Sequence, residues 1–389
     1  MKILFIFHNT DLAGGATLSG LTLIRGLKKL GHSVHAVCPS ECELVDILRK
    51  EHFETIITNY YIACPSRPHT VKSIIAYFPR LIRNIVTNRK AATLLTKAAS
   101  EIGIDIIHSN SSVINIGYKV SKSTGIPHVM HFREYGLKDT NCYTPHIPRI
   151  LRYPLQFNIA VSHGIADYRG MDLNSNSRII YNGVFPKDIC RMNSKPDNYL
   201  LYVGQLHKAK GILDLLDAYA ALPASMRKLH PLLVAGKSNT PEFQQLLSTR
   251  INKLDIKDNV RLLGYRKDAS DLMYNASAMI VPSHNEAFGR IIPEAMANGC
   301  IVIGNNNAGI KEQFDNGVEA TGEEIGIRYS GVENLTFVLT KFLSTPDSPK
   351  IRLMRMRALE VVKELYTNEN SVRAVDKFYR GILPISSES

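Results

Sequence analysis

The residues in this sequence with the clearest potential for chemistry are two glutamates, Glu286 and Glu294, in the stretch from Val281 to Gly299. The apolar run of residues 278–282 predicts a buried strand, and residues 293–298 have the pattern of a helix that stops at a glycine. The two carboxylates therefore flank the turn between a strand and a helix. Each glutamate alone has a plainer explanation, since Glu286 could be solvated and Glu294 could favour the first turn of its helix.

The turn between these glutamates predicts a phosphate site. Backbone N–H groups of Phe288, Gly289 and Arg290 would point toward a ligand placed over the helix N-terminus. A phosphate is stabilised there by unpaired donors and by the helix dipole. The carboxylates of Glu286 and Glu294 could accept hydrogen bonds from sugar hydroxyls. The pattern as a whole indicates a site for a phosphorylated ligand that is rich in hydroxyl groups.

Two adjacent glycines, Gly14 and Gly15, follow the first apolar run by a short loop and precede a helix-like stretch over residues 16–30. Such glycines let the backbone approach a ligand closely at the carboxyl end of a parallel sheet, although a simple turn would also explain them. The sequence contains no Gly-x-Gly-x-x-Gly and no Gly-x4-Gly-Lys-Ser/Thr. Neither a dinucleotide site nor a P-loop is therefore predicted.

A loop in the second half of the chain carries positive charge between a strand and a helix. It contains Gly204, Gln205 and Lys210, with Lys208 nearby, and it precedes a helical pattern over residues 212–222. A lysine ammonium in this position could meet a phosphate. A solvated lysine at a helix start would explain Lys210 equally well if the loop stood alone.

His131 ends a short apolar run that begins at Pro127. A neutral imidazole offers one hydrogen-bond donor and one acceptor, which suits contact with a sugar hydroxyl. His128 lies within the run and is interpreted as structural, because no carboxylate spacing suggests a pair of metal ligands. Arg133 and Glu134 could orient His131, bind an acceptor or form a plain ion pair, and the sequence does not choose among these roles.

The elements that would position these residues alternate between apolar runs and helix-like stretches, which predicts an α/β fold with parallel sheets covered on both faces. Five expected strands lie in each half of the chain: residues 3–7, 33–37, 104–108, 128–130 and 158–161, then 199–203, 232–235, 260–263, 279–281 and 301–303. The polar residues 185–198 separate the two sets and have the composition of a linker.

A chain of 389 residues fits two domains better than one. The expected division is an N-terminal Rossmann-like domain over residues 1–186, a C-terminal Rossmann-like domain over 187–365, and a C-terminal helix within 366–389. The six cysteines show no metal-ligand spacing and are expected to be reduced thiols of a cytoplasmic protein. The absence of an Asp-x-Asp motif gives no sign of a bound metal.

Positive charge is concentrated in the first half of the chain. Residues 1–190 contain 22 Lys and Arg against 13 Asp and Glu, whereas residues 191–389 contain 25 against 22. Residues 55–100 hold seven basic residues and no acidic one, interleaved with apolar residues. This segment could contact an anionic membrane surface or a diphosphate-linked acceptor. A solvated helix face is an equally good explanation, since Pro79 interrupts the pattern.

The Glu-x7-Glu element of Glu286 and Glu294 resembles that of the retaining glycosyltransferases of family 4. This resemblance implies the GT-B fold, in which two Rossmann-like domains face each other across a cleft. It also implies an acceptor-binding N-terminal domain, a nucleotide-sugar-binding C-terminal domain, and a last helix that returns to the first domain. The resemblance is strong over residues 200–312 and weaker before residue 182.

The resemblance also implies a role for each candidate residue. The catalytic set would be His131 at the donor sugar, Glu286 at the sugar hydroxyls and Lys210 at the diphosphate. The donor-binding residues would be Gly14, Gly15, Gly204, Gln205, Lys210, Phe288, Gly289, Arg290 and Glu294, with Glu294 at the ribose. Gln205 departs from the family, which has an arginine there, and Arg290 could supply the missing cation.

The implied function is transfer of a sugar with retained stereochemistry, without metal or cofactor. The donor would be a nucleotide-diphosphate sugar, with UDP favoured, and the acceptor a glycan or a polyprenyl-diphosphate-linked glycan at the inner face of the plasma membrane. No nucleic-acid partner is expected. Two alternatives are another GT-B enzyme, such as a nucleotide-sugar epimerase or a phosphorylase, and a catalytically silent sugar-nucleotide-binding module.

Overall fold

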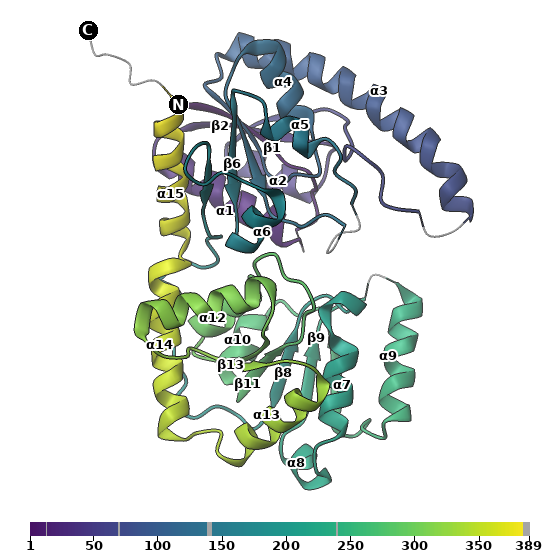
Figure 1. The fold of residues 1–389 in the computed structure, drawn as a ribbon, viewed down its shortest axis with the longest axis vertical. Helices are drawn as coiled ribbons and strands as arrows, with labels where there is room; N and C mark the ends of the chain where they lie inside the picture. The colour runs from purple at the N-terminus through teal and green to yellow at the C-terminus, as the bar shows by residue number, and fades with distance from the viewer. Residues whose placement is uncertain (13, 69–70, 138–141, 239, 384–389) are drawn as a thin grey trace. The chain divides into compact units, whose positions relative to one another are not determined.

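The computed structural model describes residues 1–12, 14–68, 71–137, 142–238 and 240–383. The chain divides into two compact units (Figure 1). The first unit contains residues 1–183 and the segment from Asn368 onward, and the second contains residues 184–367. The change of unit after residue 183 lies close to the domain boundary expected after residue 186. Among the described residues, no helix is long and apolar enough to cross a membrane.

The first unit is built on a parallel sheet in the order β3-β2-β1-β4-β5-β6-β7. Its strands are β1 (Lys2–Ile6), β2 (Ser33–Cys38), β3 (Glu54–Ile57), β4 (Ile106–Ser109), β5 (His128–Phe132), β6 (Gln156–Ala160) and β7 (Ser177–Ile179). Its helices are α1 (Gly15–Lys29), α2 (Glu43–Lys50), α3 (Val71–Ile102), α4 (Ile116–Thr124), α5 (Ile147–Leu151), α6 (His163–Arg169) and α15 (Asn368–Ile382).

The second unit repeats this plan with a six-stranded parallel sheet in the order β10-β9-β8-β11-β12-β13. Its strands are β8 (Leu200–Val203), β9 (Leu232–Ala235), β10 (Val260–Gly264), β11 (Ala278–Val281), β12 (Ile301–Asn305) and β13 (Ile327–Tyr329). Its helices are η1 (Lys187–Ile189), η2 (Lys208–Lys210), α7 (Ile212–Ala220), α8 (Ala224–Leu229), α9 (Pro241–Lys253), α10 (Ala269–Asn275), α11 (Ile291–Ala297), α12 (Ala308–Thr321), α13 (Val332–Ser344) and α14 (Pro349–Leu365).

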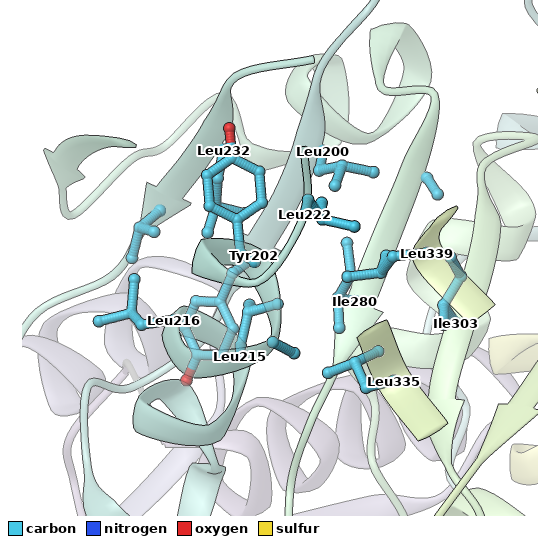
Figure 2. Close-up of a cluster of buried hydrophobic side chains, with 14 of the residues drawn as sticks. Leu200, Tyr202, Leu215, Leu216, Leu222, Leu232, Ile280, Ile303, Leu335 and Leu339 are labelled. Carbon is cyan, nitrogen blue, oxygen red and sulfur yellow. The ribbon is translucent and has the colours of Figure 1, made fainter. Parts of the chain in front are cut away.

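The α/β fold and all ten expected strands are confirmed. Apolar runs such as β4 and β11 are buried along their whole length, as expected for strands covered on both faces. One layer of the second unit's core lies between its sheet and helices α7 and α13, where Leu200 and Ile280 of the strands meet Leu215 and Leu335 of the helices (Figure 2). Strands β3, β7 and β13 are additional to the expected set.

Two helical segments can be compared with the expectations from sequence. The helix expected within residues 366–389 is α15, which begins at Asn368 after α14 has ended at Leu365. Pro79 does not interrupt its segment, since α3 continues through it for 32 residues in all. A proline inside a helix removes one backbone donor, and at this exposed position water can satisfy the carbonyl that is left unpaired.

Helix α15 completes the core of the first unit by packing on α1. A side chain at Gly26 of α1 would lie 2.2 Å from a methyl group of Val372, so the two helices approach more closely than any larger residue would allow. His32 Nε2 lies 2.7 Å from the Asp376 carboxylate, and the Tyr379 hydroxyl shares a 2.6 Å hydrogen bond with His108 Nδ1. These contacts fix α15 to its own unit.

Buried histidine makes the first unit sensitive to acid. His128 Nδ1 donates to Gln156 Oε1 at 2.6 Å, and Nε2 lies 2.8 Å from the Ser109 hydroxyl. Burial lowers the pKa of His128 from 6.5 to about 4, with partial compensation from Gln156. Between about pH 4 and pH 6.5, His128 is therefore protonated in the unfolded chain but neutral in the folded chain. The free energy of unfolding decreases as the pH falls from about 6.5 toward 4.

We expect the free energy of unfolding to fall between pH 7 and pH 5, with His128 alone accounting for about 2 kcal/mol of the loss at pH 5. Urea unfolding at a series of pH values measures the slope of the free energy of unfolding against pH. This slope gives the number of protons taken up on unfolding. In His128→Gln this uptake should fall by up to one proton. An unchanged slope in the variant would show that His128 does not contribute.

Candidate active site

The predicted residues of the second unit lie at the point where its strand order reverses. Strands β8 and β11 are neighbours in the middle of the sheet, and the chain leaves them toward opposite edges. Open parallel sheets bind ligands outside the carboxyl ends of the strands at such a point. The loop after β8 carries residues 204–210 and the loop after β11 carries residues 283–290, so the fold brings the two predicted loops together.

Gly211 sets how closely the two loops approach. It has a φ of +68° and joins η2 to α7. A Cβ atom at this position would lie 1.9 Å from the carbonyl oxygen of Pro282, so only glycine fits. His284 N donates to the Ala209 carbonyl at 3.0 Å, which holds the same two loops together. The turn that carries Lys210 is thereby fixed against the loop that carries Glu286.

Lys210 and Glu286 form an ion pair in which Lys210 Nζ donates to Glu286 Oε1. The Ser283 hydroxyl donates to the same oxygen at 3.0 Å. Glu286 Oε2 makes no hydrogen bond with the described residues. The lysine side chain is 33% exposed and the glutamate side chain 14%, so the pair is shielded but still reachable from solvent. A ligand with anionic and hydroxyl groups could address both residues at once.

The loop after β11 is fixed from behind by α12. Gly309 N donates to the Glu286 carbonyl at 2.9 Å, and Gln313 Nε2 donates to the Phe288 carbonyl. A Cβ atom at Gly309 would lie 2.8 Å from that Glu286 oxygen, which explains the glycine. The Phe288 ring is buried against Tyr366 with ring centroids 5.6 Å apart. The Phe288 side chain therefore has a packing role.

Helix α11 begins at Ile291, two residues before the expected start, with Arg290 at its N-cap. Gly289, at a φ of +82°, makes the turn into the helix. Arg290 Nη2 lies 3.3 Å from Glu294 Oε1 on the next turn. Burial raises the pKa of Glu294, and Arg290 opposes this shift. Arg290 is thus held beside the second carboxylate of the motif.

Gln205 is exposed, and its backbone carbonyl accepts a hydrogen bond from the Tyr202 hydroxyl at 2.9 Å. The backbone of Gly204 lies close to Gly236, where a Cβ atom would be 1.9 Å from the carbonyl oxygen of Gly204. The backbone of this loop is therefore fixed, while the amide of Gln205 extends into solvent.

In the first unit, Gly14 and Gly15 form the start of α1. Gly14 is the N-cap, with its N–H donating to the Asp11 carbonyl at 3.0 Å and its carbonyl accepting from Leu18 N at 3.1 Å. A Cβ atom at Gly14 would lie 3.1 Å from the Asp11 oxygen. The loop and the helix start are consequently tight, at the carboxyl end of β1.

His131 lies in β5 with its ring buried and its tautomer determined by a neighbour. Arg133 Nη2 lies 3.1 Å from His131 Nδ1. Arginine only donates, so Nδ1 is the acceptor and the proton is on Nε2. Burial and the charge of Arg133 hold the pKa of His131 well below its usual range. His131 Nε2 is buried and has no hydrogen-bond partner among the described residues.

The structure shows what Arg133 and Glu134 contact. Arg133 orients His131 and also donates to Asn110 Oδ1 at 3.0 Å and to Asn182 Oδ1. Glu134 instead accepts hydrogen bonds from the Ser111 hydroxyl and from the backbone N–H and hydroxyl of Ser112. Asn182 is therefore part of the support for His131.

A pocket of about 660 Å³ lies in the first unit and is lined by the loop after β5 and by residues of α5 and α6. Its lining is aromatic and apolar with two arginines, and includes Tyr135, Tyr143, Ile147, Tyr168 and Arg169. The Tyr135 and Tyr168 rings meet edge to face with centroids 5.3 Å apart. Sequence reasoning missed this pocket, because its residues come from several separate segments with no common motif.

Comparison with known proteins identifies the family. The model described as Glycosyltransferase Family 4 matches residues 13–187, and the model described as Glycosyl transferases group 1 matches residues 191–347. Together they cover most of the chain and both of its units. The chain belongs to glycosyltransferase family 4. It is therefore an enzyme of the glycosyltransferase class, as the Glu-x7-Glu element predicted.

Individual relatives agree with this assignment. The N-acetyl-alpha-D-glucosaminyl L-malate synthase of Bacillus anthracis is 23% identical over 392 residues, which is 95% of this chain and 94% of the relative. The lipopolysaccharide glucosyltransferase WaaG of Escherichia coli K12 is 31% identical over 153 residues, 39% of this chain and 37% of WaaG. The crystal structure of Anabaena Alr3699/HepE in complex with UDP has a TM-score of 0.78 at 17% identity, covering 98% of this chain and 100% of HepE. The fold is GT-B.

The close approach at Gly211 generates a prediction with a matched control. Gly211 and Gly322 have similar positive φ angles of +68° and +74°, but a Cβ atom at Gly322 meets nothing within 4 Å. Gly322→Ala should cost about 1–2 kcal/mol from backbone strain alone. Gly211→Ala should cost about 3 kcal/mol or more, because the methyl group also meets the Pro282 carbonyl. Denaturant unfolding measures both, and equal losses would contradict the role given to the contact.

Proposed function

We propose that this glycosyltransferase takes its sugar from a nucleotide-diphosphate donor, with UDP as the nucleotide, and transfers it with retention to a glycan or lipid-linked acceptor. The proposal includes no metal and no cofactor, since the charges of the diphosphate would be met by the chain's own cations. The observation that carries it is the Lys210–Glu286 pair at the strand reversal of the second unit. The complex of HepE with UDP supports the choice of nucleotide.

Lys210 would neutralise the diphosphate and stabilise it as the leaving group. In the free enzyme Glu286 holds the ammonium in place, so the cation is positioned before the donor arrives. When a phosphate takes over the ammonium, both oxygens of Glu286 become acceptors for donor-sugar hydroxyls. Fixed charge of this kind lowers the barrier without a reorganisation step.

Glu294 and Arg290 would bind the other parts of the donor. Glu294 would accept hydrogen bonds from the ribose hydroxyls, as a carboxylate that is half-buried and already paired on one oxygen. Arg290 is 16% exposed and lies one helical turn away. It would supply the guanidinium that most of the family carries at the position of Gln205, through a bidentate contact that glutamine cannot make.

In the first unit, His131 would contact the donor sugar near the reacting carbon. Its Nε2–H lacks a partner among the described residues, and a buried unpaired donor is costly unless a ligand satisfies it. Because the pKa of His131 is lowered, the ring stays neutral and acts as a hydrogen-bond donor, not as a proton source. Gly14 and Gly15 would allow the α1 start to approach the donor.

The acceptor would enter the first unit, where the aromatic pocket offers rings for stacking on sugars and arginines for anionic groups. The name of WaaG, a lipopolysaccharide glucosyltransferase, supports a lipid-linked glycan as the acceptor. No nucleophile is assigned, because retention in this proposal comes from attack on the same face of the sugar from which UDP leaves.

The stereochemical part of the proposal is tested with an α-linked UDP-sugar and candidate glycan acceptors, with the product configuration read by NMR. Retention predicts an α-linked product and release of UDP. A β-linked product would overturn the retaining assignment. Binding of UDP-sugars without turnover across a panel of acceptors would overturn the proposed transfer.

The proposed contact between Lys210 and the diphosphate can be tested by comparing UDP with uridine. Lys210→Ala should weaken UDP binding by about tenfold or more, since a charged hydrogen bond contributes about 1.5–3 kcal/mol, while uridine binding should change little. Lys208→Ala removes an exposed lysine from the same short turn and serves as the control. Isothermal titration measures the dissociation constants of UDP and uridine for both variants and for the unmodified protein. Equal losses for UDP and uridine in Lys210→Ala would exclude a contact with the diphosphate.

A further inference from the structure

The first half of α3 exposes a row of large apolar side chains. Figure 1 shows this part of the helix extending beyond the other elements of its unit. The side chains are between 38% and 71% exposed, which is unusual for so many large apolar residues on one helix. The row consists of Ile74, Ile75, Phe78, Ile82, Ile85 and Val86, and we call it the α3 stripe.

In its first half, α3 presents large apolar side chains to solvent and polar amides to the rest of its unit. Residues of the α3 stripe recur at intervals of three and four, so they share one face. The face toward the unit is held instead by amides: Asn84 Nδ2 donates to the Ile62 carbonyl at 3.0 Å, and Asn88 exchanges hydrogen bonds of 2.9 and 3.0 Å with the backbone of Tyr61. Both asparagines are buried. These contacts fix the rotation of the helix and keep the stripe outward.

Positive charge accompanies the α3 stripe. Lys72, Arg83 and Lys90 are exposed and lie eleven and seven residues apart, close to whole numbers of helical turns, so they line one flank of the stripe. Arg89 continues the line of the stripe itself. No acidic residue occurs between residues 55 and 100. An apolar face bordered by charge of one sign complements an anionic surface with an apolar interior.

We propose that the α3 stripe docks the protein on an anionic lipid bilayer, with the apolar side chains at the boundary between headgroups and acyl chains and the basic flank among the headgroups. The stripe occupies one face of a single projecting helix. A partner protein with an apolar groove would bury the basic side chains at its border without compensating their charge, which is costly. A bilayer accommodates both features at once.

The α3 stripe is also connected to the aromatic pocket. Ser66, five residues before α3, pairs with Cys142 in an isolated antiparallel bridge. The next residue, Tyr143, lines the pocket and is 51% exposed. If the acceptor is lipid-linked, as in the proposed function on which this step rests, docking brings the pocket close to the bilayer that carries the acceptor.

Flotation with vesicles tests the docking without any sugar donor or acceptor. The full chain should bind vesicles of phosphatidylglycerol mixed with phosphatidylcholine at least about tenfold better than vesicles of phosphatidylcholine alone, and added salt should weaken the binding. Failure to bind the anionic vesicles at low salt would overturn the proposal. Because no nucleotide is present, this outcome is independent of whether the enzyme uses UDP-sugars.

Two sets of variants separate the contributions of the α3 stripe and its flank. Ile75→Gln with Phe78→Gln should remove most binding, whereas Phe337→Gln, which changes a phenylalanine of similar exposure on α13, should have no effect. Lys72→Gln with Arg83→Gln and Lys90→Gln should reduce binding to anionic vesicles. The matched charge control changes three exposed lysines of the second unit, Lys228, Lys253 and Lys257, to Gln.

Both sets of α3 variants should keep the urea unfolding midpoint of the unmodified protein, which shows that they remain folded. Equal loss of vesicle binding in the α3 variants and their controls would overturn the proposal, because it would indicate general attraction by net charge. A second copy of the chain is the competing occupant. A dimer in sedimentation that Ile75→Gln with Phe78→Gln converts to monomer, together with no vesicle binding, would assign the stripe to self-association instead.

Discussion

The contact between Gly211 and the Pro282 carbonyl is the constraint on which the chemistry of the second unit depends. It brings the loops after two neighbouring strands so close that a lysine and a glutamate 76 residues apart form an ion pair. The pair in turn fixes a cation and a carboxylate before any ligand binds. The same loop is held on its other side by Gly309, so two glycines in separate helical segments define the position of Glu286. The reversal of strand order places the two loops side by side, and the close approaches at Gly211 and Gly309 fix the distance between Lys210 and Glu286.

The sequence was informative wherever a local pattern had a direct structural cause. All ten expected strands form, because long apolar runs bounded by polar residues have few alternatives in a parallel sheet. The short strands β3, β7 and β13 were missed, since they lie at sheet edges and are only partly buried, so their sequences contain no long apolar run. Pro79 was expected to interrupt the pattern of residues 55–100, but α3 continues through it and is anchored beyond that point by Asn84 and Asn88.

Relations between distant segments could not be read from the sequence. Nothing in the spacing of Arg133, Asn110 and Asn182 predicts that they form one network, which decides the tautomer of His131. The aromatic pocket likewise combines the loop after β5 with residues of α5 and α6. The family resemblance named the candidate residues without giving their contacts. Those contacts explain the chemistry each residue can perform, such as a neutral His131 that donates from Nε2.

The return of the chain to the first unit has a consequence for biosynthesis. Val372, Val375 and Tyr379 of α15 belong to the same apolar cluster as Ile3 and Phe5 of β1. The ribosome therefore makes the strands of the first unit early but delivers the last part of their core only after the whole second unit has been translated. During this interval the surface of α1 that will receive α15 is uncovered, while the second unit, whose sequence is continuous, has all of its core residues. The first unit therefore cannot complete its core until the second unit has been synthesised.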